Sequence, residues 1–296
     1  MNIIAISDIY SDIGIIQEFA QFVSKNKKPI IIVAGDIGLG PSPRHKQDVE
    51  YILSLLSKIS SQTFYIPGDS DSKQFEISTL PNVKNLDGKY HVINDENVKI
   101  GLLGLGGAPL HSVRNTELSP YLWDESIPMV AENLLTGLKI NIEKIAQEHP
   151  DYIILVTHSP PYGIADRSKP ITLQETLVLR DILEELEGEE KTEIKPRAGA
   201  KKTISIRHLG SRVLSDFVKY YKPDIHIFGH VHKEGGKIEI REATKFFNIS
   251  HISSLPYKLT GRKFLTMKLT REDMSFSFNH LVRSDLLFSE FVDIYL

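Results

Sequence analysis

The sequence predicts an α/β fold, and three observations lead to that prediction. Six short apolar runs alternate with amphipathic helical patterns over roughly the first 230 residues. The stretch that follows has strand patterns and turns in place of helical patterns. Asp or His residues follow directly after most of the apolar runs. An N-terminal α/β segment followed by a β-rich C-terminal segment favours two β-sheets packed against each other.

The six apolar runs are predicted to be buried strands. Each is rich in β-branched or aromatic residues, ends at Gly, Pro or a polar cluster, and is apolar on both faces, as strands covered on both sides are. They are Ile3–Ile6, Ile30–Ala34, Thr63–Ile66, Ile100–Leu105, Tyr152–Val156 and Ile225–Phe228.

Four segments between these strands have apolar residues at helical spacing. The first, Asp12–Val23, carries Ile15, Ile16 and Phe19 on one face. The others are Val49–Ile59, Ala131–Ala146 and Ser211–Tyr221, and Ser211 is predicted to be the N-cap of the last helix.

The β-rich C-terminal segment is predicted to hold three more strands, Lys237–Arg241, Phe246–Ile249 and Phe264–Leu269. No internal repeat or low-complexity linker interrupts the chain. We therefore predict one domain over residues 1–270 and a C-terminal tail, 271–296, that packs on the domain or forms a homodimer contact through its apolar residues 286–296.

A charged insert, about residues 166–207, stands apart from the rest of the chain. It runs acidic from Asp181 to Glu190 and then basic from Lys195 to Lys202. A solvated helix end followed by a loop is the favoured interpretation, because charge runs are usually solvated. The alternative is a lid whose basic half meets an anionic substrate.

Composition excludes several classes of function. The 296 residues carry 35 Lys+Arg against 38 Asp+Glu, and this balance gives no strong nucleic-acid signal. The absence of Cys excludes disulfides, thiolate catalysis, Cys-zinc sites and iron–sulfur clusters. No apolar run is long enough for a membrane span and the N-terminus lacks the pattern of a signal peptide, so a cytoplasmic protein is expected. The Ile-, Lys- and Glu-rich composition would suit a thermophile.

Polar residues with metal-binding side chains follow five of the six predicted strands. They are Asp8, Asp36, Asp69 and Asp71, His158, and His230 with His232. Groups at the carboxyl ends of neighbouring strands converge on one crevice, and Asp with His is a ligand set for Mn, Fe, Zn or Mg. Taken singly, each Asp could be a helix N-cap, as Asp12 and Asp71 could, and each His a satisfied core residue. The recurrence of one arrangement favours a metal site.

In this order the residues resemble the calcineurin-like metallophosphoesterase superfamily. Its five motifs are D-x-H, G-D, G-N-H-[DE], an isolated His and G-H-x-H. The corresponding stretches here are Asp8-Ile9-Tyr10, Gly35-Asp36, Gly68-Asp69-Ser70-Asp71, His158 and Gly229-His230-Val231-His232. The resemblance covers roughly the first 255 residues and is to the small bacterial and archaeal members. It implies a four-layer α/β/β/α sandwich with two mixed β-sheets.

The resemblance also implies a ligand set for two divalent metal ions. Asp36 would bridge them, Asp8 and His232 would hold the first, and His158 and His230 would hold the second with the motif-three residue, here Asp69. Such a pair binds a phosphoester and hydrolyses it with a metal-bound hydroxide. The residues implied in catalysis are Asp36, His158 and His230.

Three positions depart from the family pattern. Tyr10 replaces a His; it either serves as a phenolate ligand to a strong Lewis acid such as ferric iron or packs beside the site. Without a Tyr10 ligand the first metal site loses a ligand or takes a water in its place, so two metal ions, or one, are expected. Asp69 replaces an Asn, binds metal more tightly and adds negative charge. Ser70 replaces the His credited with protonating the leaving group, and a general acid is worth ~10²–10⁴-fold in rate.

Several other residues are candidates for a role at the site. His208 and His111 are candidate substitute acids, with a solvated loop His as the alternative. Arg44, Arg114 and Arg167 could clamp phosphate oxygens. Trp123 with Tyr121 could stack on a substrate base or anchor a loop, and Asn248 is expected near the site.

These observations predict a metal-dependent phosphoesterase, with a phosphodiesterase acting on a small substrate favoured. The alternative is a non-catalytic protein that binds a metal or a phospholigand on the same scaffold, because Tyr10, Asp69 and Ser70 replace the expected His, Asn and His.

Overall fold

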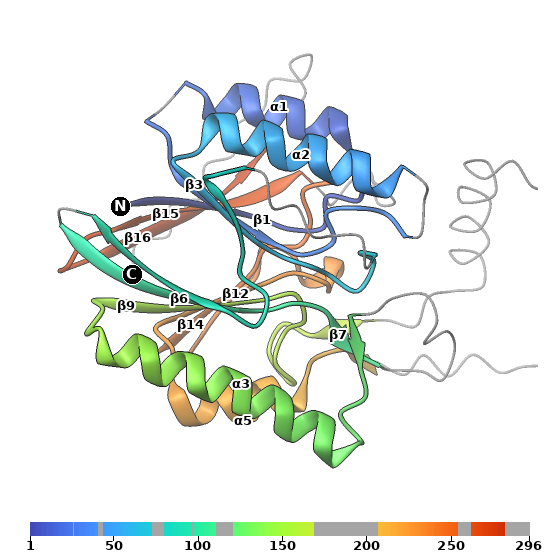
Figure 1. The fold of residues 1–296 in the computed structure, drawn as a ribbon, viewed down its shortest axis with the longest axis vertical. Helices are drawn as coiled ribbons and strands as arrows, with labels where there is room; N and C mark the ends of the chain where they lie inside the picture. Colours follow the sequence, from blue (N-terminus) through green and yellow to red (C-terminus); the bar gives the residue numbers. More distant parts are fainter. Residues whose placement is uncertain are drawn as a thin grey trace, which may run out of the picture.

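The computed structural model describes residues 1–25, 27–40, 44–72, 80–95, 97–110, 121–168, 207–253 and 262–281. Over these residues the chain forms a four-layer α/β/β/α sandwich with two mixed, six-stranded β-sheets (Figure 1). The fold class predicted from the sequence is confirmed.

The first sheet has the strand order β16-β15-β1-β2-β3-β4. Its four parallel strands are β1 (Asn2–Ile6), β2 (Ile30–Ala34), β3 (Gln62–Ile66) and β4 (Val83–Asn85). The antiparallel strands β15 (Lys263–Leu269) and β16 (Met274–His280) complete it beside β1.

The second sheet has the order β13-β14-β12-β9-β6-β5. Its parallel strands are β6 (Val98–Leu105), β9 (Tyr152–Thr157), β12 (Ile225–Phe228) and β14 (Thr244–Asn248). The edge strands β5 (Tyr90–Asp95) and β13 (Ile238–Arg241) run antiparallel to their neighbours. Two short strand pairs, β7 (Ala108–Pro109) with β8 (Leu122–Trp123) and β10 (Arg167–Ser168) with β11 (Arg207–His208), lie outside both sheets.

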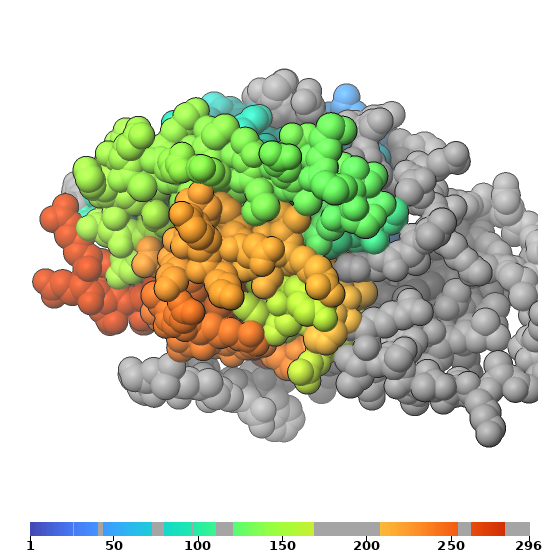
Figure 2. Space-filling view, turned by 90° about the horizontal axis from the view of Figure 1, so that it is seen from below, coloured from blue at the N-terminus to red at the C-terminus, as the bar shows by residue number. Residues whose placement is uncertain are grey.

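Helices cover the outer face of each sheet. Helices α1 (Ile13–Val23) and α2 (His45–Ile59) pack on the first sheet, and α3 (Pro128–Gln147) and α5 (Arg212–Tyr221) pack on the second (Figure 1). Figure 2 shows the face on which the green α3 and the orange α5 lie side by side.

Three apolar layers hold the sandwich together. Ile16 and Ile52 lie between the first helix pair and its sheet, Ile32 and Ile227 lie between the two sheets, and Phe217 packs under the second helix pair. Burial of such side chains, ~1.5–3 kcal/mol each, is the main force that brings the sheets together. The packing aligns the carboxyl ends of β1, β2 and β3 with those of β9 and β12.

Most of the predicted elements are confirmed with small shifts of their ends. Helix α2 begins at His45 rather than Val49, and the predicted cap Ser211 accepts a hydrogen bond from the Leu214 N–H at 3.0 Å. Asp12 is indeed an N-cap, since it accepts from the Ile15 N–H at 3.1 Å.

The prediction missed β4, β5 and β16, because these strands are short or half-exposed and give no apolar run. The charge run 181–202 and the apolar tail 286–296 lie outside the described residues, so their roles stay predictions. In the part of the chain that the structure describes, no helix is long and apolar enough to cross a membrane.

Candidate metal centre

The predicted ligand residues converge at the carboxyl ends of strands from both sheets. Asp8, Asp36 and Asp69 follow β1, β2 and β3 in the first sheet, whereas His158 follows β9 and His230 follows β12 in the second. Because both sheets present their parallel carboxyl ends at the same edge, the crevice rule for α/β proteins applies across the sandwich.

Four of these side chains form a tight cluster. Asp69 Oδ1 lies 2.8 Å from His158 Nε2 and 2.9 Å from His230 Nδ1, and His158 Nε2 lies 3.4 Å from Asp36 Oδ2. His158 and Asp36 are fully buried. We call Asp36, Asp69, His158 and His230 the four-residue cluster.

The orientation of His158 is set by a backbone carbonyl. His158 Nδ1 lies 2.8 Å from the Ala34 carbonyl oxygen, which can only accept a hydrogen bond, so Nδ1 carries the proton. Nε2 therefore faces the two carboxylates, with a proton between them that a metal ion would displace. This is the arrangement by which outer contacts prepare an imidazole for a metal ion.

A second group lies around Asp8. His232 Nε2 is 3.2 Å from Asp8 Oδ1, and the Tyr10 hydroxyl is 2.9 Å from His232 Nε2 and 3.4 Å from Asp8 Oδ1. The His230 backbone N–H also donates to the Asp8 carboxylate, at 3.2 and 3.3 Å. We call Asp8, Tyr10 and His232 the tyrosine triangle.

Three of the candidate ligands have strained backbones. Asp8, Asp36 and His230 have φ values of 57°, 50° and 69°, the left-handed region that residues with a Cβ rarely adopt. Such strain costs roughly 1–3 kcal/mol per residue and concentrates at functional sites. It aims these side chains into the crevice at the expense of stability.

Gly68 is more than a turn residue. A Cβ at this position would lie 1.9 Å from Asp36 Oδ1 and 2.3 Å from the Asp36 nitrogen. The G-D sequence of the third motif therefore lets the loop after β3 approach the Asp36 carboxylate closely.

Opposite charges shift the titration of the four-residue cluster. Burial by itself raises the pKa of Asp69, but the charges and hydrogen bonds of His230 and His158 outweigh burial and hold the pKa well below its usual range. Burial lowers the pKa of His158, yet Asp36 and Asp69 raise it well above 6.5, and Asp69 likewise raises the pKa of His230. Positive charge is thus strongly favoured between these groups.

The pKa shifts in the tyrosine triangle differ from those in the four-residue cluster. Burial and the charges of Asp36, Asp8 and Asp69 raise the pKa of Tyr10 well above 10, so the phenol keeps its proton. Burial is outweighed at Asp8, where the hydrogen bond and charge of His232 lower the pKa of the carboxyl.

The four-residue cluster fits a divalent metal ion. Its nitrogen and oxygen donors are 2.8–3.4 Å apart, the spacing expected for ligands that each lie ~2.0–2.2 Å from a shared ion. An ion would replace the protons that otherwise separate the carboxylates from the imidazoles. Asp69, His158 and His230 lie close enough together to share one ion, as do Asp8, Asp36 and His158.

Two residues that the sequence analysis named, Asp71 and Asn248, support the loops that carry the ligands. Asp71 accepts hydrogen bonds from the N–H groups of Gly38 and Gly68, both at 2.8 Å, and burial with the charge of Asp36 raises its pKa to about 8. Asp71 thus links the loops after β2 and β3. The expected Asn248 is buried and donates to the carbonyls of Ala165 and Val231. It ties the loop after β9 to the G-H-x-H segment.

His208 is held by a carboxylate that the sequence analysis did not single out. Its Nδ1 lies 2.8 Å from Asp166 Oδ1, Asp166 is buried, and the His208 side chain is 33% exposed. Among the described residues, none of the hydrogen bonds of His208 is to the four-residue cluster. Strand β10, which pairs with β11, packs against the 3-10 helix η2 (His232–Glu234).

The remaining candidates do not gather at the cluster. Trp123 donates to Glu125 and packs on the core, which agrees with a loop anchor, and Tyr121 packs on the opposite apolar layer. Arg44 lies at the N-cap position of α2 without a side-chain capping hydrogen bond, and Arg167 is exposed on β10. His111 and Arg114 lie outside the described residues.

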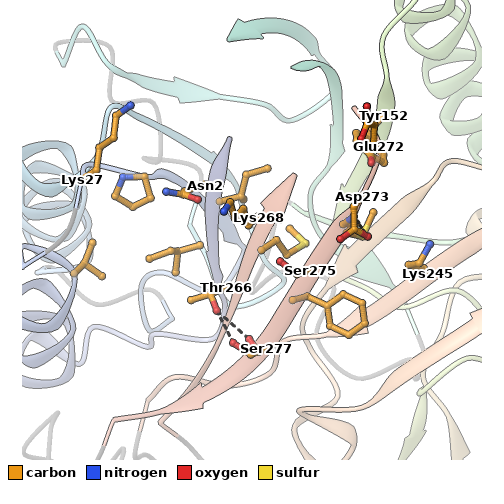
Figure 3. A pocket seen from close by; sticks show the side chains of 17 residues that line it. Asn2, Lys27, Tyr152, Lys245, Thr266, Lys268, Glu272, Asp273, Ser275 and Ser277 are labelled. Carbon is orange, nitrogen blue, oxygen red and sulfur yellow. Dashed lines mark hydrogen bonds between the residues drawn. The ribbon is translucent and has the colours of Figure 1, made fainter. Parts of the chain in front are cut away.

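A cavity of about 900 Å³ lies elsewhere in the fold (Figure 3). Its lining includes Asn2, Pro29 and Tyr152, at the amino ends of β1, β2 and β9. Because ligand sites of α/β sheets lie at the carboxyl ends, this cavity is unrelated to the metal centre.

The comparisons with known proteins agree with this geometry. The sequence pattern of the calcineurin-like phosphoesterases matches residues 1–234, a range that includes every candidate ligand. The chain belongs to the calcineurin-like phosphoesterase family. Members of this metallophosphoesterase family use divalent metals, and the described residues offer donors for one in the four-residue cluster and in the group of Asp8, Asp36 and His158. A comparison with curated protein sequences finds no match.

Several solved structures resemble this chain at low sequence identity. TT1561 of Thermus thermophilus is 15% identical with a TM-score of 0.61, and the alignment covers 95% of this chain and 99% of that one. The sulfate thiohydrolase SoxB of Thermus thermophilus is 12% identical with a TM-score of 0.48, covering 93% and 43%. An archaeal phosphodiesterase is 9% identical with a TM-score of 0.43, covering 94% and 100%. The likeness to TT1561 supports the calcineurin-like fold.

His226 is buried away from the ligands, and we expect it to make the stability of the fold depend on pH. Thr157 Oγ1 donates to the Ser159 carbonyl, so His226 Nε2, 2.8 Å away, donates to Thr157, and Nδ1 has no partner among the described residues. Burial lowers the pKa of His226 to about 3. Below pH 6.5 the unfolded chain binds a proton that the folded chain does not, so stability is complete above pH 6.5 and falls as the pH drops toward 3.

Between these pH values the free energy of unfolding should change with pH, through His226, by up to ~1.4 kcal/mol per pH unit. Urea unfolding at pH 7 and at pH 4.5 measures it, and His226→Asn should reduce the slope by about this amount. Equal slopes in the two proteins would contradict the prediction.

Proposed function

We propose that the protein is a metal-dependent phosphodiesterase that hydrolyses a small phosphodiester. The observation that carries the proposal is the convergence of Asp36, Asp69, His158 and His230 from two sheets, with His158 oriented by Ala34. Membership of the calcineurin-like phosphoesterase family supports the reaction class.

The four-residue cluster would hold the metal, which when bound supplies Lewis-acid stabilisation of phosphoryl charge and lowers the pKa of water. Ser70 fixes the Asp36 carboxylate, because its N–H donates at 2.8 Å and its hydroxyl at 3.1 Å. With Asp8 and Asp69 nearby, the crevice carries three carboxylates. A phosphodiester monoanion is repelled less by them than a phosphomonoester dianion, so diesters are the favoured class.

The proton for the leaving group needs a donor other than Ser70. We assign this role to His208, with Asp166 as the residue that positions it. The Asp166 carboxylate accepts a hydrogen bond from His208 Nδ1–H, which orients the ring and leaves the other ring nitrogen to meet a substrate. Its strand pair packs beside the helix that begins at His232.

Leaving-group dependence tests the role of His208. His208→Ala should lower the hydrolysis of diesters with alkyl leaving groups by ~10²–10⁴-fold, because an alkoxide must be protonated as it departs. Hydrolysis of bis(4-nitrophenyl) phosphate should change little. Asp166→Asn should act in the same direction more weakly. An equal loss on both substrates would contradict an acid role.

The proposed activity itself is tested with metal-free protein. Bis(4-nitrophenyl) phosphate should be hydrolysed after addition of Mn²⁺, Fe²⁺, Zn²⁺ or Mg²⁺, should be hydrolysed faster than 4-nitrophenyl phosphate, and should stop reacting when chelator is added. Folded protein that turns over neither substrate with any of these metals would contradict the proposal.

A non-catalytic binding protein is the second candidate, and Ser70 favours it. The Ser70 hydroxyl is engaged with Asp36 and is not a proton donor for a leaving group near neutral pH. Calorimetry with inorganic phosphate distinguishes the two candidates. Tight, metal-dependent phosphate binding without turnover would favour the binding protein.

A further inference from the structure

We propose that the centre holds one metal ion, in the four-residue cluster, and that the Tyr10 phenol occupies the position of the other ion of the family's pair. This inference rests on the proposed metal centre and names its composition. It departs from the bridging role of Asp36 and from the first-metal role of Asp8 and His232 that the resemblance implies.

The phenol oxygen engages the atoms that a first metal would need. It lies 2.9 Å from His232 Nε2 and 3.4 Å from Asp8 Oδ1, and His232 Nε2 itself lies 3.2 Å from Asp8 Oδ1. A tyrosine oxygen extends further from its Cα than a histidine Nε2 does, by about the ~2 Å of a metal–nitrogen bond. Tyr10 in place of a histidine therefore puts a hydroxyl where the ion itself would lie.

Several contacts hold the tyrosine triangle in place. The Tyr10 N–H donates to the Asp36 carbonyl at 3.0 Å, and the Tyr10 ring meets the His232 ring edge-on, with 5.5 Å between centroids. The His232 ring stacks on His251 at 4.4 Å with an interplanar angle of 26°. Moving either ring aside for an ion would break several of these contacts.

The Asp8 carboxylate already has hydrogen-bond partners without a cation. Its carboxylate accepts from the His230 backbone N–H and lies within hydrogen-bond distance of His232 and Tyr10. Buried carboxylates that are fully hydrogen-bonded need no metal for stability.

In the four-residue cluster the Ser70 hydroxyl donates to Asp36 at 3.1 Å, but carboxylates also face imidazole nitrogens directly. Asp69 Oδ1 faces two imidazole nitrogens at 2.8 and 2.9 Å, and Asp36 approaches His158 at 3.4 Å. The single ion is therefore expected among Asp36, Asp69, His158 and His230.

Metal stoichiometry tests the inference without reference to activity. Protein stripped with chelator is equilibrated with Mn²⁺, desalted and analysed by elemental mass spectrometry, with folding checked by circular dichroism. Wild-type protein should retain one Mn per chain, and Tyr10→His, which restores the family ligand, should retain two. Two Mn per chain in the wild type would overturn the inference.

The two histidines of the G-H-x-H motif give a matched pair of variants. His230→Ala should lose the ion, whereas His232→Ala should keep it, and these two variants test the inference even where Tyr10→His does not fold. Loss of the ion in both variants, or retention in both, would overturn it. A visible charge-transfer absorption after loading with iron would also overturn it, because Tyr10 would then be a phenolate ligand.

Activity measured on the same samples separates this inference from the proposed function. One ion per chain without hydrolysis would contradict the function alone. Hydrolysis with two ions per chain would contradict the inference alone, and wild-type protein that binds no ion would contradict both.

Discussion

Replacing His158 with Ala should lower phosphodiester hydrolysis by at least ~10²–10³-fold, the loss typical for one electrostatic group of an active site. His158 is fully buried and brings its Nε2 within 3.4 Å of Asp36 and 2.8 Å of Asp69. Without the imidazole, those carboxylates lose both a metal ligand and their main positive partner. The variant should also lose bound Mn²⁺ in elemental analysis.

His226→Ala is the matched control for His158→Ala. Both histidines are fully buried in the second sheet, at β9 and β12, but His226 contacts Thr157 and aromatic rings instead of the ligands. The control should lose stability, with kcat and metal content close to those of the wild type. If the two variants lose activity equally while folded, His158 has no special role.

Gly35→Ala should both destabilise the fold and weaken metal binding. A Cβ at Gly35 would lie 2.4 Å from His158 Nδ1 and 2.9 Å from the Gly68 Cα, and Gly35 has a φ of +91°. The strained backbone and the clash together should cost ~2–5 kcal/mol, since overpacking alone costs ~1–3 and a left-handed alanine ~1–2. The displaced imidazole should no longer hold its hydrogen bond to Ala34 and should bind Mn²⁺ less tightly.

Gly88→Ala measures the cost of an alanine in a left-handed backbone conformation without a steric clash. Gly88 also has a positive φ, +63°, but no atom lies within 4 Å of its added Cβ. It should cost only ~1–2 kcal/mol and leave Mn²⁺ affinity unchanged. Urea unfolding and calorimetric titration measure both quantities, and equal effects at the two glycines would refute the account of Gly35.

Local patterns were enough to predict most of the framework. A buried strand such as Ile30–Ala34 is recognisable because every residue must be apolar when both faces are covered. Strand β5 was missed because Tyr90–Asp95 is a half-exposed edge strand of mixed polarity, and its place depends on pairing with β6. Edge strands depend on a neighbour that the local sequence does not specify.

In the candidate site, too, some features could be predicted from local sequence and others could not. Asp8, Asp36 and His158 could be named in advance, because each follows a strand and strand ends converge in α/β folds. Their protonation and orientation could not, because the decisive contacts join distant parts of the chain. The Ala34 carbonyl that orients His158 is 124 residues away, and the Asp166 that holds His208 is 42 residues away.

The sequence by itself determined the layered α/β architecture, the calcineurin-like motif order and the replacement of a motif-one histidine by Tyr10. Periodicity and motif spacing are local properties, so they can be recognised from the sequence without coordinates. Only the tertiary structure decided what Tyr10 does, because its 2.9 Å contact is with His232, 222 residues further along the chain. Contacts across two sheets depend on how the sandwich closes, which the local pattern does not encode.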